Sequence, residues 1–131
     1  MKDSQPQAIY LSDYKAPLFL IEKTDLIFSL TEEYTTVTST LLMKKNPERL
    51  KEENILVLHG QDLVLQSIAV DGRELSTSEY TCDEETLTLT IPDKCIITCV
   101  TQIKPQENTS LEGLYKSSGM YCTQCEAEGF R

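Results

Sequence analysis

Apolar and polar side chains alternate most regularly in residues 86–91, where threonines separate Leu87, Leu89 and Ile91. Successive side chains of a β-strand point to opposite faces, so a period of two predicts a strand whose three apolar residues turn inward. The β-branched threonines also favour an extended backbone. We therefore expect this segment to form a strand with one face in the core.

Similar patterns recur along most of the chain, and turn signals separate them. Asp71 and Gly72 follow an apolar run and are typical of a two-residue hairpin turn, because glycine readily adopts a positive φ. Residues 55–58 are continuously apolar, which predicts a strand covered on both faces. The other expected strands are residues 18–30 (one strand or two), 35–43, 63–70 with a bulge near Gln66, 73–75, 79–82 and 95–103.

This succession of short strands predicts an all-β fold, a β-sandwich or saddle-like domain of about seven to nine mostly antiparallel strands. Asn46 followed by Pro47 fits either a short helix capped by Asn46 or a solvated loop. From Asn108 onward Gly and Ser become more frequent, and we expect an irregular backbone there. No linker or repeat divides the chain, so residues 1–131 are expected to form a single domain.

The charge balance excludes some classes of partner. Lys and Arg total 12 against 21 Asp and Glu, a formal net charge of −9. Nucleic acids and anionic membrane surfaces both require a basic face, so neither is expected as a partner. No apolar run is long enough to span a bilayer, and the first residues do not resemble a secretory signal. The odd number of cysteines, five, then indicates reduced thiols and a cytoplasmic location.

Two features suggest metal or redox chemistry, but neither is sufficient. Cys122 and Cys125 form a Cys-x-x-Cys pair, which fits half of a zinc site, a redox pair or two ordinary packed thiols. His59 is the single histidine and has no nearby partner in the sequence, so a structural role is expected. One histidine cannot build the H-E-x-x-H zinc site of a metallopeptidase, so we expect no catalytic residue and no metal site in this chain.

The last eleven residues carry an alternation of a different kind. In an extended backbone Gln124, Glu126 and Glu128 would project to one side, and Cys125 and Ala127 to the other. Burying two unpaired carboxylates is costly, so this face suits either solvent, as in a frayed terminus, or a bound cation such as an ammonium group.

Specific strings at both ends of the chain resemble one family. They are Tyr-Leu-Ser-Asp-Tyr-Lys-Ala-Pro at residues 10–17, Asn-Thr-Ser-Leu-Glu-Gly-Leu-Tyr at 108–115 and Gln-Cys-Glu-Ala-Glu-Gly-Phe-Arg at 124–131. Together they resemble the N-terminal domain of bacterial aminopeptidase N, a zinc-dependent gluzincin peptidase. The resemblance covers nearly the whole chain and is densest from Asn108 onward.

The resemblance implies a specific role for two residues. In that family the Gln and Glu of a Gln-x-Glu element hold the free amino terminus of the peptide substrate, and the matching positions here are Gln124 and Glu126. It also implies that zinc, its ligands and the catalytic domain lie in a part of the parent protein beyond this chain. The chain would then contact that catalytic domain and the peptide, and would be inactive alone.

The alternative is a free-standing β-sandwich that binds protein or glycan through an edge or a loop. The chain has no Trp, and its six Tyr are scattered, so no aromatic platform favours this alternative.

Overall fold

The structure is a computed structural model that describes residues 7–126. In that range ten strands form three antiparallel sheets, and there are three short 3-10 helices, of which the first, η1 (Leu11–Asp13), precedes the strands. The expected all-β class is confirmed. None of the helices in the described range is long and apolar enough to cross a bilayer.

The largest sheet has five strands in the order β1-β2-β8-β4-β5. Its central pair, β2 and β8, is in register from Thr35 opposite Ile103 to Lys44 opposite Lys94. Because β1 lies at the edge, one side of its backbone ladder is unpaired. The strands are β1 (Phe19–Leu30), β2 (Thr35–Lys45), β4 (Val64–Val70), β5 (Arg73–Glu74) and β8 (Lys94–Ile103).

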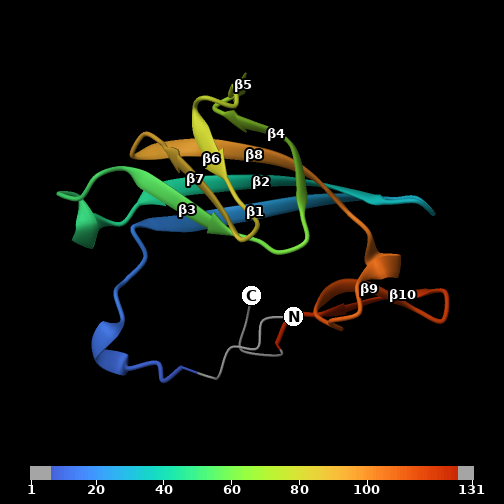
Figure 1. Cartoon of the computed structure of the whole chain (residues 1–131). Helices are drawn as coiled ribbons and strands as arrows, with labels where there is room; N and C mark the ends of the chain where they lie inside the picture. Colours follow the sequence, from blue (N-terminus) through green and yellow to red (C-terminus); the bar gives the residue numbers. More distant parts are fainter. Residues whose placement is uncertain (1–6, 127–131) are drawn as a thin grey trace.

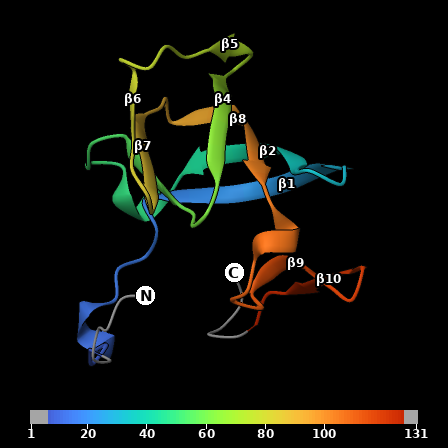
Figure 2. The ribbon, with the colours of Figure 1, turned by 45° about the vertical axis from the view of Figure 1, so that its right-hand side comes forward.

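A three-stranded sheet crosses one face of the larger sheet, at the end where β1 begins and β2 ends (Figures 1 and 2). Its strands are β3 (Ile55–His59), β7 (Thr86–Thr90) and β6 (Tyr80–Cys82), in that order. The core lies between the two sheets. Its buried apolar residues are Phe19, Met43, Leu56, Ile68, Leu89, Ile91, Cys95, Ile97 and Cys99.

Most of the local predictions for these strands are confirmed. Leu89 and Ile91 are buried and Leu87 is partly buried, as the alternation indicated. Asp71 and Gly72 both have positive φ, 50° and 82°, as a type I′ hairpin turn requires. The β4–β8 register shifts between Leu65 and Ser67, which is the expected bulge.

The prediction that residues 55–58 are covered on both faces is wrong. Leu56 is buried, but Ile55 and Val57 on the opposite face are 42% and 43% exposed. The three-stranded sheet packs on the larger sheet with one face only, and no described element covers the other. A continuous apolar run therefore does not by itself require two covered faces.

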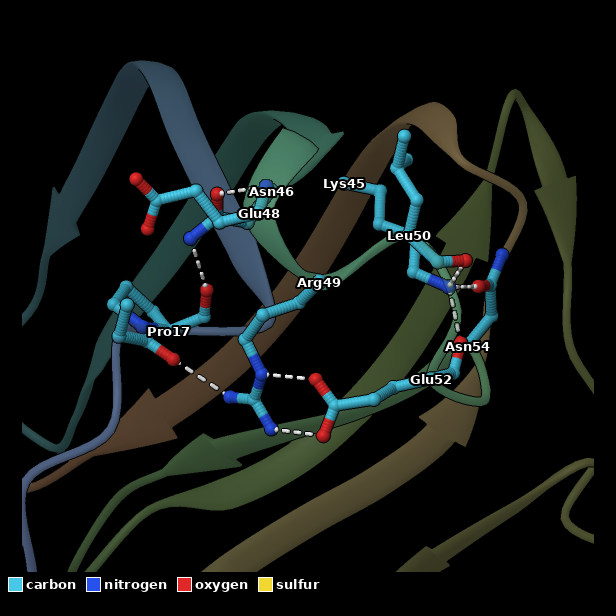
Figure 3. Close-up of polar contacts among 9 residues, drawn as sticks. Pro17, Lys45, Asn46, Glu48, Arg49, Leu50, Glu52 and Asn54 are labelled. Carbon is cyan, nitrogen blue, oxygen red and sulfur yellow. Dashed lines mark hydrogen bonds and ion pairs between the residues drawn. The ribbon is translucent and has the colours of Figure 1, made fainter.

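The loop that connects the two sheets is organised around a buried cation (Figure 3). Lys45, the last residue of β2, is only 4% exposed. Its ammonium group donates to the carbonyl oxygens of Leu50 and Glu52 and to the side-chain oxygen of Asn54. Asn54 in turn donates to the Asp93 carboxylate at 2.7 Å, just before β8. One lysine thus links the end of β2, the start of β3 and the turn before β8.

Asn46 and Arg49 attach the incoming N-terminal segment to the same loop. Asn46 accepts from the Glu48 amide at 3.0 Å and so caps helix η2 (Pro47–Arg49), which confirms the short-helix alternative. Its side-chain amide donates to the Pro17 carbonyl at 2.8 Å, and Arg49 donates to the Ala16 carbonyl at 2.6 Å. Arg49 also forms a two-pronged pair with Glu52, which lowers the pKa of that carboxyl through its hydrogen bonds.

The three-stranded sheet covers only part of the large sheet. Leu26 lies in register with Ser39 and Cys99, on the face that carries the core, and Phe28 and Leu30 continue along that face. These three side chains are nevertheless 52%, 47% and 48% exposed. The far half of β1 therefore presents apolar side chains that no described element covers.

The contacts of Lys45 lead to a stability prediction. Replacing Lys45 by Ala would remove the donor from three partly buried oxygens, and leaving such polar groups unsatisfied costs about 1–3 kcal/mol. We expect a matching drop in the free energy of unfolding, measured by urea denaturation. The matched control is Lys44→Ala, because Lys44 is the exposed neighbour on the same strand. Equal effects of the two substitutions would contradict this role for Lys45.

Candidate functional site

The C-terminal part of the described chain is a regular hairpin, so the expectation of an irregular backbone from Asn108 onward is wrong. Strands β9 (Gly113–Ser117) and β10 (Met120–Gln124) pair antiparallel, with Gly113 opposite Gln124. Ser118 and Gly119 connect them with positive φ values of 50° and 79°. A Ser-Gly pair between two short alternating segments is a known turn signal, and it could have predicted this hairpin from the sequence.

The hairpin lies apart from the two larger sheets and follows helix η3 (Pro105–Glu107) at the end of β8 (Figure 2). Pro105 is fully buried, and the Gln106 side chain donates to the Glu33 carbonyl at 2.6 Å in the β1–β2 turn. The Tyr121 hydroxyl donates to the carbonyl of Thr31 in the same turn at 3.4 Å. Within the hairpin the Lys116 ammonium lies 5.0 Å from the centre of the Tyr121 ring. The position of the hairpin thus depends on a few polar contacts and one buried proline.

Gln124 is the last residue of β10, and its side chain is exposed. It lines an open cleft of about 1170 Å³ together with its neighbour Cys125. Glu126 follows the end of the strand and is also exposed. Ala127 and Glu128 lie outside the described residues, so the one-sided arrangement predicted for residues 124–128 stays a prediction.

The cleft is formed between the hairpin, the η3 segment and the ends of β3, β4 and β8. Among the described residues the charged side chains of its lining are mostly acidic, with Lys104 as the basic one, and His59 also lies on the wall. Lys104 lies 3.8 Å from the Glu107 carboxylate, so part of its charge is already compensated. The acidic side chains of the lining are Asp62, Glu85, Glu107 and Glu112. Such a cleft concentrates cations rather than anions.

The cysteines differ in burial, and none belongs to a group of three or more candidate metal ligands in the described part of the chain. All five are free thiols, and no set of three or more His, Cys, Asp or Glu side chains there could hold a metal ion. Cys95 and Cys99 are buried in the core, and this burial raises the pKa of each thiol to about 11. At neutral pH both are protonated, so they act as small apolar side chains and not as nucleophiles.

Comparison with known proteins gives a consistent result, although no profile of a protein family matches the chain. The chain is 44% identical over its full length to aminopeptidase N of Caulobacter vibrioides. It is 37% identical over 97% of its length to aminopeptidase N of Escherichia coli, and 42% identical over 95% to that of Haemophilus influenzae. The chain spans only 14–15% of the length of these relatives.

Solved structures agree with the sequence relatives. Aminopeptidase A of Legionella pneumophila, solved with aspartic acid, superposes on 91% of this chain with a TM-score of 0.81 and 29% identity, and 14% of that protein is covered. An M1 zinc metallopeptidase of Deinococcus radiodurans, solved with a Tyr-Ser-Ala substrate, superposes on 79% with a TM-score of 0.60. Its identity of 12% shows a common fold alone, and 25% of it is covered. Over its whole length, in sequence and in fold, this chain is homologous to the N-terminal part of aminopeptidase N.

Proposed function

We propose that residues 1–131 are the N-terminal β domain of a zinc-dependent aminopeptidase, and that Gln124 and Glu126 hold the free amino group of its peptide substrate. The observation that carries this proposal is the match of the whole chain to one end of aminopeptidase N at 37–44% identity. The comparisons do not favour the alternative, a free-standing module for protein or glycan binding.

The chemistry of the two side chains suits the proposed ligand. A protonated amino terminus offers three N–H donors, and a glutamine amide oxygen and a glutamate carboxylate are both acceptors. A charge-assisted hydrogen bond of this kind contributes roughly 1.5–3 kcal/mol. The acidic side chains of the cleft beside Gln124 add an attractive field for the same cation.

Holding the amino group also explains why an aminopeptidase would remove one residue at a time. If the terminus is fixed on this wall of the site, only the first peptide bond lies at the catalytic centre. The chain has one histidine, so zinc and its ligands belong to the remainder of the parent protein. When bound there, zinc would supply a water molecule activated for attack on the peptide bond.

The exposed apolar half of the large sheet supports a second partner, the catalytic domain of the same protein. Leu26, Phe28 and Leu30 form a contiguous stripe on β1, and stripes of this kind mark surfaces that another protein surface covers. The relatives are about seven times longer than this chain, so the remaining sequence is ample to provide that cover. We also propose a cytoplasmic location, which the five free thiols support, with neither nucleic acid nor membrane as a partner.

The amino-group anchor is tested by Glu126→Gln in a full-length protein that carries this chain. The substitution keeps the shape of the side chain but removes the charge opposite the substrate ammonium. Breaking a buried ion pair costs about 3–5 kcal/mol. We expect kcat/KM to fall by about 100-fold or more. A competitive inhibitor without an amino group should bind the variant and the unsubstituted full-length protein equally well. Glu128→Gln is the control and should have almost no effect. Equal losses from the two substitutions would mean that the anchor role had been assigned to the wrong carboxylate.

The location of zinc is tested by metal analysis of two samples after dialysis. The full-length protein is expected to retain about one zinc ion and to release amine from an aminoacyl anilide. The isolated chain is expected to do neither, because it lacks a two-histidine ligand set. Stoichiometric zinc in the isolated chain that disappears in a Cys122→Ser, Cys125→Ser variant would revive the Cys-x-x-Cys site.

The covered surface is tested by cysteine labelling, in a background where the exposed Cys82 and Cys125 are replaced by Ser. A thiol reagent should modify Phe28→Cys readily in the isolated chain and much more slowly in the full-length protein. Lys51→Cys, in the exposed loop before β3, is the control and should react at similar rates in both samples. Equal labelling of Phe28→Cys in the two samples would argue against this interface.

A further inference from the structure

One side chain connects the hairpin that carries Gln124 to the rest of the domain. Asn108 follows helix η3 and is partly buried. Its backbone amide donates to the Pro105 carbonyl at 3.2 Å, which fixes it to the end of that helix. The ring of Pro105 in this helix is buried, and the Gln106–Glu33 hydrogen bond attaches the helix to the β1–β2 turn.

The side chain of Asn108 makes four further hydrogen bonds, all to the segment that leads into β9. Its amide nitrogen donates to the Glu112 carbonyl at 2.8 Å and to the Leu114 carbonyl at 2.9 Å. Its oxygen accepts from the backbone amide of Ser110 at 3.1 Å and from the Ser110 hydroxyl at 2.7 Å. The primary amide has two N–H donors and one oxygen with two lone pairs, so all of its hydrogen-bonding capacity is used.

The two carbonyls that receive these bonds flank the residue opposite Gln124. Gly113 pairs with Gln124 in the hairpin, and Leu114 pairs with Thr123. The backbone around them is in an uncommon conformation, since Leu111 and Gly113 have φ values of 59° and 67°. A non-glycine residue in this region is unfavourable unless its surroundings hold it there. The side chain of Asn108 provides such a constraint, because it binds the backbone on both sides of Gly113.

We propose that Asn108 is a positioning residue for the amino-group anchor, connecting helix η3 to the start of β9 and thereby fixing Gln124 on the wall of the cleft. The inference rests on the proposed role of Gln124. Asn108 also lines the cleft, but its side-chain donors and acceptors are used in bonds to Ser110, Glu112 and Leu114. We therefore expect its effect to pass through β9 and the Gly113–Gln124 pair. A shift of about 1 Å in a group that binds substrate can reduce the rate by about 100-fold.

The test uses a full-length protein that carries this chain and two matched inhibitors, an amino acid amide and the same amide without its amino group. Asn108→Ala should weaken binding of the first inhibitor by roughly tenfold or more and leave binding of the second nearly unchanged. Asn108→Asp keeps the size and the acceptor oxygen but removes both N–H donors, so it should act in the same direction. Thr109→Ala, at the exposed neighbouring position, is the control and should be silent.

A double-substitution cycle separates positioning from general destabilisation. If Asn108 acts through Gln124, then Asn108→Ala should have almost no additional effect in a Gln124→Ala background. Equal losses for both inhibitors, additive losses in the cycle, or no loss at all would overturn the inference. If Asn108→Ala does not fold, Ser110→Ala removes the hydroxyl bond to Asn108 and a longer one from the Glu112 amide. It should cause a smaller loss with the same preference for the amine-bearing inhibitor.

The same experiment distinguishes failure of this inference from failure of the proposed function. A silent Gln124→Ala substitution with the amine-bearing inhibitor would remove the anchor role of Gln124, and the inference with it. A costly Gln124→Ala combined with a silent Asn108→Ala would leave the anchor in place and overturn only the positioning role.

Discussion

The two sheets of this domain depend on a buried ammonium group. Lys45 ends β2, and its ammonium group donates hydrogen bonds to two carbonyl oxygens and to the Asn54 side chain. The same contacts hold the loop that must cross from one sheet to the other, and Asn54 extends them to Asp93 before β8. Among residues 7–126 the apolar core comprises nine buried residues, so this polar link contributes substantially to the alignment of the sheets.

The hairpin that carries the proposed anchor is held mainly by polar contacts outside the core. The β9–β10 hairpin shares no residue with the buried core, and its position depends on Pro105, on Asn108 and on hydrogen bonds to the β1–β2 turn. A site built on polar contacts can be shifted at a lower energetic cost than one embedded in a core. In the parent enzyme, as proposed, packing against the catalytic domain would restrict the hairpin further.

Two exposed surfaces of the chain differ in polarity and charge, and we therefore propose different partners for them. The stripe of Leu26, Phe28 and Leu30 is apolar and extended, which suits permanent contact with another part of the same protein. The cleft beside Gln124 is open, and the charged side chains of its described lining are mostly acidic, which suits a cationic ligand that enters and leaves. The domain would thus serve both as a wall of the active site and as a structural partner of the catalytic domain.

The sequence by itself determined the class of the fold and most of its strands. Period-two patterns such as Leu87, Leu89 and Ile91 depend only on which face of a strand is apolar, and Asp71-Gly72 encodes its turn locally. The family resemblance likewise depended on local strings, and it singled out Gln124 and Glu126. Only the tertiary structure decided that Val57 is exposed and that Lys45 is buried, because burial depends on which sheet packs against which face. The contacts behind the proposed role of Asn108 also came only from the structure, since its side chain reaches Ser110, Glu112 and Leu114 only when the chain turns at Leu111 and Gly113.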